Sequence, residues 1–291
     1  MVSDVSSGKT AADENFPVGS WLLAPRLRPH VATFYAFARA ADDIADTDRL
    51  EADIKVARLA AMGAALTTGA GDSPESPAAL RMRDSLAATG VEPRHCLDLL
   101  DAFTQDATKL RYADWGELID YCDRSAAPVG RYLLDLHGEA RGGWPPADAL
   151  CNALQVLNHL QDCQDDHRTL DRVYLPLDWL EGAGGTVGDL TRDAATPAVR
   201  KTLDNCLDGV EALLVEARAL PGALKSRRLA MESSVILRLA RRLVARLRRG
   251  DPLAGRVALS GADFARCGIL GAAAGLFAGE TPAPPAVAAR P

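Results

Sequence analysis

Apolar residues recur every three to four positions over most of this chain, which is the spacing of one face of an α-helix. This period predicts helices over residues 30–46, 80–89, 94–110, 114–138, 147–167, 196–219 and 226–249. Stretches rich in glycine, serine and proline separate the helical segments, as at 67–77 and 182–188. Neither a repeat nor a convincing pair of strands interrupts the pattern, so we expect an all-α protein.

Composition supports the helical interpretation. Of the 291 residues, 48% are apolar, which is enough for a sizeable core, and only 5% are aromatic. Alanine, leucine and arginine are abundant and β-branched residues sparse, a balance that favours helix over sheet. We expect a single helical domain over residues 14–278, preceded by a disordered leader over 1–13 and followed by a Pro/Ala-rich tail over 279–291.

The net charge and the cysteines limit which binding partners and which cellular compartment we expect for the protein. A net charge of −6 gives no global attraction to nucleic acid, so none is expected as a partner. The six cysteines lack CxxC spacing and no signal peptide is visible, as in a cytoplasmic protein with reduced thiols. The arginine-rich helix over 226–249 leaves two interpretations open: a solvated helix face, or peripheral contact with anionic lipid at the inner face of a membrane.

An acidic cluster ends the first predicted helix. One stripe of this helix spans a sector of roughly 40–60° and carries an aromatic, a guanidinium and two carboxylates: Tyr35, Arg39, Asp42 and Asp46. Asp43 points about a quarter-turn away. A solvated acidic helix end is one interpretation, because like charges at i and i+4 cost only about 0.2–0.5 kcal/mol on an exposed helix. The helix dipole disfavours acids at this end, which points instead to a site.

A matching cluster lies in a helix far downstream. Amides and carboxylates share one sector of that helix: Gln155, Asn158, Asp162 and Asp166, with Asp165 at its edge. Their oxygens suit Mg²⁺ and suit zinc poorly. Carboxylates about 6 Å apart repel by about 2–3 kcal/mol at an effective dielectric near 20, a cost that bound cations would remove. Two such helices facing each other predict a magnesium site for a polyanion such as diphosphate.

Arginines flank both clusters. Arg39 lies one turn before Asp42, while Arg168 and Arg172 follow the second cluster. A guanidinium matches phosphate oxygens bidentately. Ordinary salt bridging at a helix end remains the alternative for each arginine.

A proline interrupts the helical pattern between the clusters. Pro128 follows small residues and precedes Gly130, and a proline inside a helix removes a hydrogen-bond donor and kinks it. Two interpretations stay open: the kinked segment lines an elongated apolar channel, or its small residues allow tight helix packing.

The acidic clusters and their flanking residues resemble the conserved motifs of the squalene/phytoene synthase family, the head-to-head prenyl synthases. The matching segments are Arg39-x-x-Asp42-Asp43-x-x-Asp46, Tyr121 with Ala127-Pro-Val-Gly130, Gln155-x-x-Asn158-x-x-x-Asp162-x-x-Asp165-Asp166, and Arg172-Val-Tyr174-x-Pro176. The resemblance covers about residues 14–250. It implies an isoprenoid-synthase-type helical bundle with a central apolar cavity, and ionisation of a prenyl diphosphate assisted by Mg²⁺, with no nicotinamide cofactor.

Further segments are similar to the bacterial hydroxysqualene synthases of hopanoid pathways. They are Glu14-Asn-Phe-Pro-Val18, Phe34-Tyr-Ala-Phe-Ala-Arg39, Leu160-Gln-Asp-Cys-x-x-Asp166 and Asp251-Pro-Leu253. This similarity implies that the chain converts presqualene diphosphate and water into hydroxysqualene and diphosphate, coupled to a presqualene diphosphate synthase. The alternatives are condensation of two prenyl diphosphates, such as farnesyl diphosphate, to presqualene diphosphate, dehydrosqualene or phytoene, and a non-catalytic helical assembly protein.

The resemblance also assigns roles to individual residues. The metal ligands it implies are Asp42, Asp43, Asp46, Asp162, Asp165 and Asp166. The substrate-binding residues it implies are Arg39, Gln155, Asn158, Arg168 and Arg172. The catalytic residues it implies are Tyr35, Arg39, Tyr121, Asn158, Arg172 and Tyr174. The residue that places the attacking water is not identified by the sequence.

Overall fold

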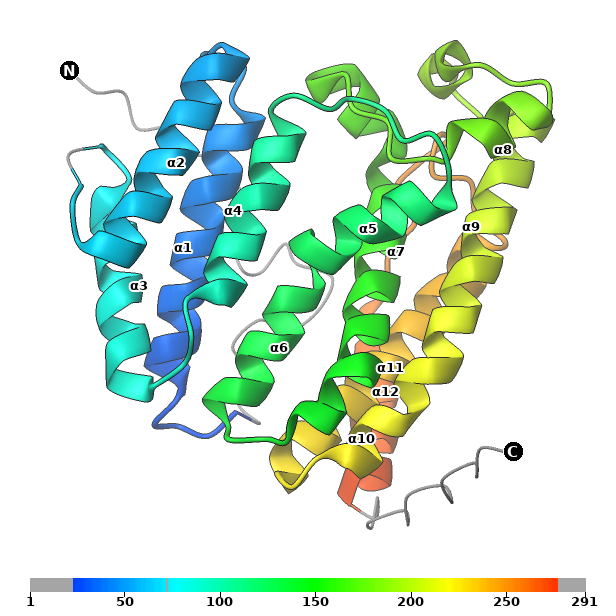
Figure 1. Ribbon diagram of the computed structural model, residues 1–291. Coiled ribbons are helices and arrows are strands. Elements are labelled where there is room, and N and C mark those ends of the chain that lie inside the picture. Colours follow the sequence, from blue (N-terminus) through cyan, green and yellow to red (C-terminus); the bar gives the residue numbers. More distant parts are fainter. Residues whose placement is uncertain (1–22, 72, 277–291) are drawn as a thin grey trace, which may run out of the picture.

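The computed structural model describes residues 23–71 and 73–276, and the regular elements in this part of the chain are helices (Figure 1). The all-α expectation is confirmed. The expected leader over 1–13 and tail over 279–291 lie outside the described residues. In chain order the helices are α1 (Arg28–Asp46), α2 (Ala52–Thr68), α3 (Ser76–Thr89), α4 (Arg94–Asp106), α5 (Trp115–Ser125), α6 (Ala127–Leu136), α7 (Trp144–Leu170), α8 (Leu177–Gly182), α9 (Pro197–Glu216), α10 (Leu220–Ala223), α11 (Arg227–Leu247) and α12 (Gly261–Leu276), with 3₁₀ turns η1 (Arg141–Gly143), η2 (Val187–Thr191) and η3 (Ala217–Ala219).

The helices form two packed groups joined through the middle of the molecule. Helices α1, α2, α3 and α4 pack on one another on one side, and α7 packs on α9 and α11 on the other (Figure 1). Helix α6 connects the groups, because it packs on both α4 and α7. One continuous cluster of buried apolar side chains runs through both groups, with Phe37, Met62, Leu157 and Val210 completely buried.

Local sequence accounts for several helix ends. Pro29 occupies the first turn of α1, where its missing N–H is not needed. Helix α2 ends at Gly69, whose φ of 79° is the left-handed conformation that glycine adopts without strain. Helix α11 begins after Ser226, whose hydroxyl accepts a hydrogen bond from the Leu229 amide at 3.4 Å.

The segment around Pro128 is a break between two helices, where the sequence predicts one kinked helix over 114–138. Helix α5 ends at Ser125 and α6 begins at Ala127, because Ala126 between them leaves the helical conformation with φ −120° and ψ −46°. A Cβ on Gly130 would lie 2.8 Å from the Cys151 sulfur, so α6 approaches α7 closely. Both interpretations of this segment therefore hold: it packs tightly on α7, and it also lines a cavity.

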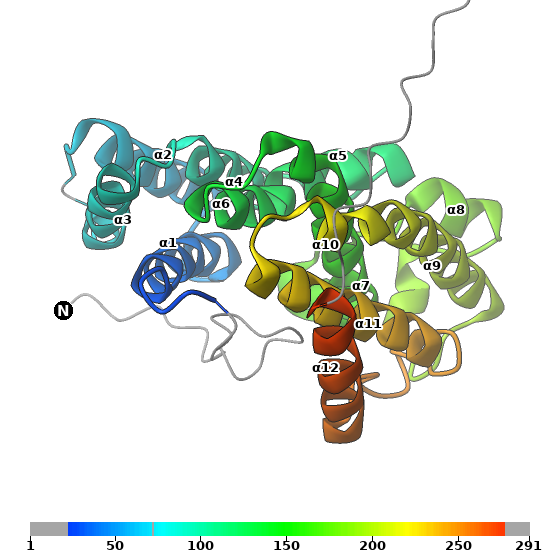
Figure 2. The same cartoon turned by 90° about the horizontal axis from the view of Figure 1, so that it is seen from below.

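Helix α12 was not predicted, since its residues show only a mild apolar stretch. It lies against α11 along two glycines one turn apart (Figure 2). A Cβ on Gly271 would lie 2.6 Å from the Val235 Cα, and one on Gly275 would lie 2.5 Å from the Met231 Cα. Glycine at these two positions allows the backbones of α11 and α12 to touch.

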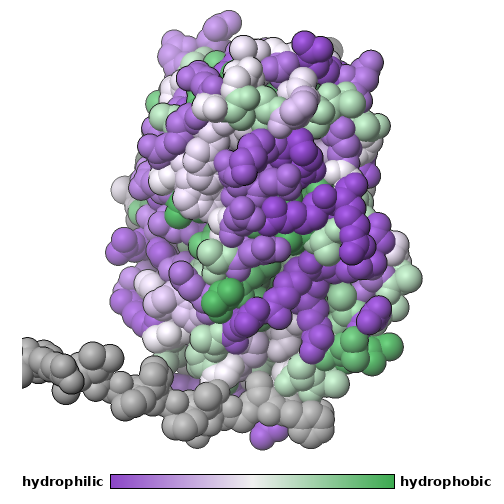
Figure 3. All heavy atoms as spheres, turned by 90° about the vertical axis from the view of Figure 1, so that its right-hand side faces the viewer, coloured by the Kyte–Doolittle hydropathy of each residue, from purple (hydrophilic) through white to green (hydrophobic). Residues whose placement is uncertain are grey.

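The outer surface gives no sign of a span through a bilayer. Over the described ranges, every helix is too short or too polar to cross a membrane. The face that carries α8 and α9 is mostly hydrophilic, with a narrow apolar strip across it (Figure 3).

Candidate active site

A cavity of about 380 Å³ lies among α1, α4, α6, α7, α10 and α11. Its walls are mainly apolar, with Phe34 on α1, Leu133 on α6 and Leu150 on α7 among the lining residues. Toward the C-terminal half of α1 the lining becomes polar through Arg39 and Asp42. The expected central apolar cavity is thus present, and three of the four residues in the predicted stripe, Tyr35, Arg39 and Asp42, form part of its wall.

The first acidic cluster is crowded with negative charge. Asp42 is 31% exposed and receives an ion pair from Arg39 at 3.1 Å. Burial among protein atoms and the charges of Asp46, Asp106 and Asp43 nevertheless raise the pKa of Asp42 to about 8. Arg39 also pairs with Asp43 at 3.4 Å, so one guanidinium serves two carboxylates. The cluster therefore lacks enough local positive charge to keep all its carboxylates ionised.

Arg172 joins the two acidic clusters. Its backbone amide donates to the Asp166 carbonyl oxygen at 3.2 Å, which fixes it to the end of α7. Its buried guanidinium donates to the Asp46 carboxylate at 2.6 Å and to the Ala45 carbonyl at 2.8 Å, both at the end of α1. It also donates to the Asp106 carbonyl at 3.1 Å. Arg172 thus holds α1, α4 and α7 at a fixed mutual distance.

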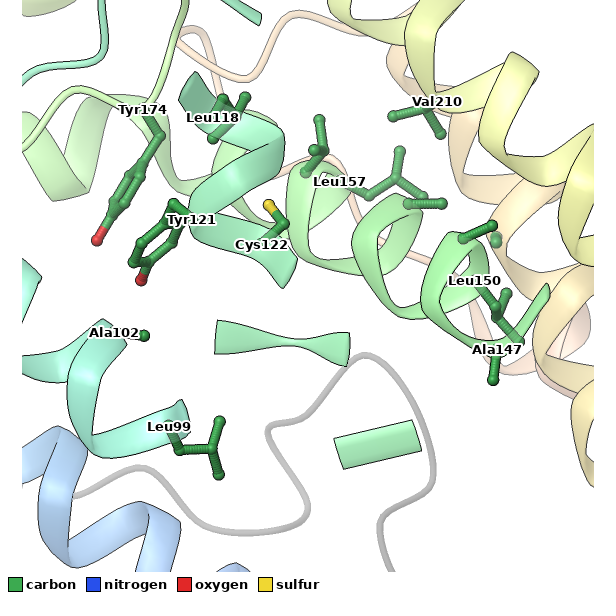
Figure 4. Packing of buried hydrophobic residues seen from close by; sticks show 14 of the residues in the cluster. Leu99, Ala102, Leu118, Tyr121, Cys122, Ala147, Leu150, Leu157, Tyr174 and Val210 are labelled. Carbon is green, nitrogen blue, oxygen red and sulfur yellow. The ribbon is translucent and has the colours of Figure 1, made fainter. Parts of the chain in front are cut away.

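A buried carboxylate, Asp106, binds two of the three predicted catalytic tyrosines. The Tyr121 hydroxyl donates to Asp106 at 2.6 Å, and the Tyr174 hydroxyl donates to its other oxygen at 2.9 Å. The two rings lie side by side with centroids 5.5 Å apart (Figure 4). Burial raises the pKa of Asp106, with Arg172 and both tyrosines acting in the opposite direction. The pKa values of Tyr121 and Tyr174 are raised well above their ordinary range, chiefly by burial, so both phenols stay protonated.

The second acidic cluster lies along α7, beside the tyrosines. His159 stacks on Tyr174 with ring centroids 3.6 Å apart, and it also contacts Gln155 at 3.2 Å and Asp166 at 4.0 Å. Asn158, Asp162 and Asp165 occupy the same helix, and Asp165 is exposed.

Arg168 lies apart from this group. It is exposed and donates to the Thr191 carbonyl at 2.9 Å, so its guanidinium points toward η2. Its expected role in binding substrate has no support from this position.

The aspartates of the two clusters supply only oxygen donors, and those in the described part of the chain do not form a closed ligand cage. Among the described residues, no three His, Cys, Asp or Glu side chains converge closely enough to hold an ion alone. Burial, together with the charges of Asp46 and Asp43, raises the pKa of Asp42 to about 8. Divalent cations would relieve this crowding, and all the donors are the hard oxygens that Mg²⁺ prefers.

The sequence of this chain is similar to those of known proteins. The model of the squalene/phytoene synthase family matches residues 9–263. The chain belongs to this family. Its relatives include the hydroxysqualene synthase of Rhodopseudomonas palustris, 48% identical over 90% of this chain and 89% of the relative. The hydroxysqualene synthase of Zymomonas mobilis is 42% identical over 93% of this chain and 91% of the relative.

Solved structures show the same family fold. The squalene synthase of Alicyclobacillus acidocaldarius is 31% identical, with a TM-score of 0.68 over 82% of this chain and 90% of that one. A dehydrosqualene synthase has a TM-score of 0.76 over 89% of this chain and 91% of that one, at 18% identity, a likeness of fold alone.

Asp106 was not predicted from the sequence as a site residue. It is the last residue of α4 and has no carboxylate one turn away, so no periodic signal distinguishes it from an ordinary helix end. Its environment is formed by Tyr121 and Tyr174, which lie 15 and 68 residues away in the sequence.

Proposed function

We propose that this chain converts presqualene diphosphate and water into hydroxysqualene and diphosphate. The observation that carries the proposal is the apolar cavity whose wall becomes polar at Arg39 and Asp42. Such a cavity suits a long hydrocarbon attached to a polyanion. The two hydroxysqualene synthases that are 48% and 42% identical to the chain support the choice of reaction.

We propose that Mg²⁺ is held between the two acidic clusters. Asp42 and Asp46 from α1 would bind it together with Asp162 and Asp166 from α7, with Asp43 and Asp165 in support. When bound, Mg²⁺ stabilises the charge that develops on the departing diphosphate.

Neighbouring side chains would orient the proposed magnesium site and the diphosphate. Arg39 supplies a guanidinium beside Asp42 that is suited to diphosphate oxygens. Arg172 fixes the orientation of Asp46. On α7, Gln155 and Asn158 contribute amide groups to the face that carries Asp162.

The walls beyond the diphosphate would protect the hydrocarbon cation. Phe34, Leu133 and Leu150 exclude bulk water from the cavity. The aromatic ring of Tyr35, which lines the cavity, offers a π-face that attracts a cation. Tyr121 and Tyr174 lie outside the lining of the cavity and are buried side by side. Because the phenols of Tyr121 and Tyr174 donate to Asp106, their rings keep one orientation during the reaction.

Magnesium should stabilise the protein more at high pH than at low pH. The folded-state pKa of Asp42, about 8, exceeds the ordinary value of 3.8. Without metal, the stabilisation from retaining this proton is present at acid pH and is lost as the pH rises toward about 8. Since Mg²⁺ must displace the proton, its binding strengthens over the same interval.

Thermal unfolding with and without Mg²⁺ at about pH 6 and about pH 9 tests this expectation. The Mg²⁺-induced rise in Tm should be larger at the higher pH, and Asp42→Asn should remove most of the difference. An equal rise at both values would contradict the assignment of Asp42 as a ligand.

Filling the cavity from α1 should weaken substrate binding. Ala38 lines the cavity, and a phenylalanine there would occupy space that the hydrocarbon needs. We expect Ala38→Phe to raise KM about tenfold or more, because each methylene excluded from an apolar site loses about 0.8 kcal/mol. The matched control is Ala36→Phe, an exposed position on the same helix, which should leave KM unchanged. Equal KM values in the two variants would contradict the location of the hydrocarbon.

One assay tests the proposed reaction directly. The pure protein is incubated with Mg²⁺ and either presqualene diphosphate or farnesyl diphosphate, with and without NADPH, and the products are identified by mass spectrometry. We expect hydroxysqualene from presqualene diphosphate, independent of NADPH. Condensation of farnesyl diphosphate alone, or squalene formed only with NADPH, would overturn the proposal.

A further inference from the structure

A carboxylate lines the apolar cavity far from the acidic clusters in the sequence. Glu232 on α11 is 8% exposed, and it is the only carboxylate besides Asp42 that the described residues contribute to the cavity wall. Its neighbours on this face of α11 are Leu229, Ser233 and Ile236. Burying a carboxylate beside such residues is costly, so a functional reason for its presence is required.

Helix α11 places Glu232 opposite the diphosphate end of the cavity. Glu232 lies in the second turn of α11, and this helix begins where the Lys225 and Ser226 amides donate to Glu139, just before the start of α7. Asp162 and Asp166 lie near the other end of α7. A group at this position faces the hydrocarbon rather than the leaving diphosphate.

Ser233, the other polar residue of α11 in the cavity wall, forms hydrogen bonds within its own helix. Its hydroxyl donates to the Leu229 carbonyl at 2.9 Å and to the Ala230 carbonyl at 3.2 Å, within its own helix. Glu232 differs from Ser233 in carrying a carboxylate, which is a stronger hydrogen-bond acceptor and a stronger base than a hydroxyl.

We propose that Glu232 holds the water that captures the carbocation and accepts its proton, which rests on the function proposed above. A lone pair of the water oxygen forms the new C–O bond to the cationic carbon. The resulting oxonium loses one proton to the Glu232 carboxylate, and the neutral alcohol remains. The diphosphate has already left with the electron pair of the broken C–O bond, so charge and atoms balance without a reductant.

The surroundings of Glu232 keep its backbone fixed. Met231 and Val235 flank it on α11, and these are the residues that Gly275 and Gly271 of α12 contact. Direct backbone contact between the helices leaves this turn of α11 little freedom to move. A water held by Glu232 would consequently occupy a constant position relative to the cation.

The test measures how the cation is partitioned between products. Wild-type protein, Glu232→Gln and Glu232→Asp are incubated with presqualene diphosphate and Mg²⁺ in water enriched in heavy oxygen. Released diphosphate reports ionisation, and labelled alcohol reports capture by water. The matched control is Glu211→Gln, an exposed carboxylate on α9 that pairs with Arg248 at 3.2 Å.

We expect Glu232→Gln to lower the ratio of alcohol to diphosphate about tenfold or more, in keeping with the loss of a general base. Hydrocarbon formed by proton loss should replace the missing alcohol, and Glu232→Asp should restore part of the ratio. Glu211→Gln should match the wild type. Thermal unfolding of each variant verifies that the fold is retained.

Three other results are distinguishable. If the wild type forms no labelled alcohol, the proposed function fails and this proposal with it. If the wild type forms it and Glu232→Gln keeps the same ratio, only the role of Glu232 is overturned. If alcohol and diphosphate fall in parallel, Glu232 supports the fold or ionisation, and its role as the base is likewise overturned.

Discussion

Replacing Asp42 or Asp162 with asparagine should reduce kcat on the order of 10³-fold while leaving the helical fold intact. Each substitution removes a negative oxygen from the proposed magnesium site, and charge stabilisation of a leaving group of this kind is worth about 10²–10³-fold or more per interaction. Folding should survive because Asp42 lies in a group of mutually repelling carboxylates, so removing one charge relieves repulsion. Steady-state release of diphosphate from presqualene diphosphate measures the effect, and circular dichroism verifies the helices.

The control for this experiment is Asp48→Asn, an exposed residue just beyond α1. It should keep wild-type turnover. Wild-type turnover in Asp42→Asn or Asp162→Asn, or equal turnover of the native chain in EDTA, would refute the magnesium–diphosphate mechanism.

Replacing Arg172 with leucine should destabilise the fold by about 3–5 kcal/mol, because it breaks a buried ion pair and leaves the partners unpaired. The arginine side chain is 6% exposed and pairs with Asp46 at 2.6 Å. Two carbonyl oxygens, of Ala45 and Asp106, lose their donors at the same time. Chemical denaturation followed by circular dichroism gives the free energy of unfolding.

Arg168→Leu is the matched control for stability. Arg168 is exposed and makes one hydrogen bond, to the Thr191 carbonyl, so its loss should cost under about 1 kcal/mol. If both substitutions had the same small effect on unfolding, Arg172 would not be the link that holds α1, α4 and α7 together.

Helix positions and the two acidic stripes could be predicted because both are local properties of the sequence. Asp42 and Asp46 are one turn apart on any helix, and the amide and carboxylate series on α7 follows the same spacing. The break beside Pro128 was predicted only as a kink. Its full extent depends on Ala126, which leaves the helical conformation although alanine is a strong helix former.

Residues whose role depends on distant neighbours could not be predicted. Glu232 lies in an ordinary amphipathic helix, and only the fold shows that its side chain lines a cavity. The interaction of Arg172 with Asp46 spans 126 residues, although the family resemblance assigns both residues to the expected diphosphate site. Helix α12 was missed because its glycines lower helix propensity, while their value lies in contact with α11.

The contact between α11 and α12 makes the catalytic outcome sensitive to changes in the outer layer of the protein. Gly271 and Gly275 touch the backbone on both sides of the turn that carries Glu232. A larger residue at either glycine would clash with the α11 backbone, so the packing of the two helices around this turn must change. Among the described residues, α12 contributes no side chain to the cavity wall. The proposed role of Glu232 therefore predicts that substitutions at Gly271 and Gly275 change the ratio of alcohol to hydrocarbon, and a screen limited to the cavity wall would miss them.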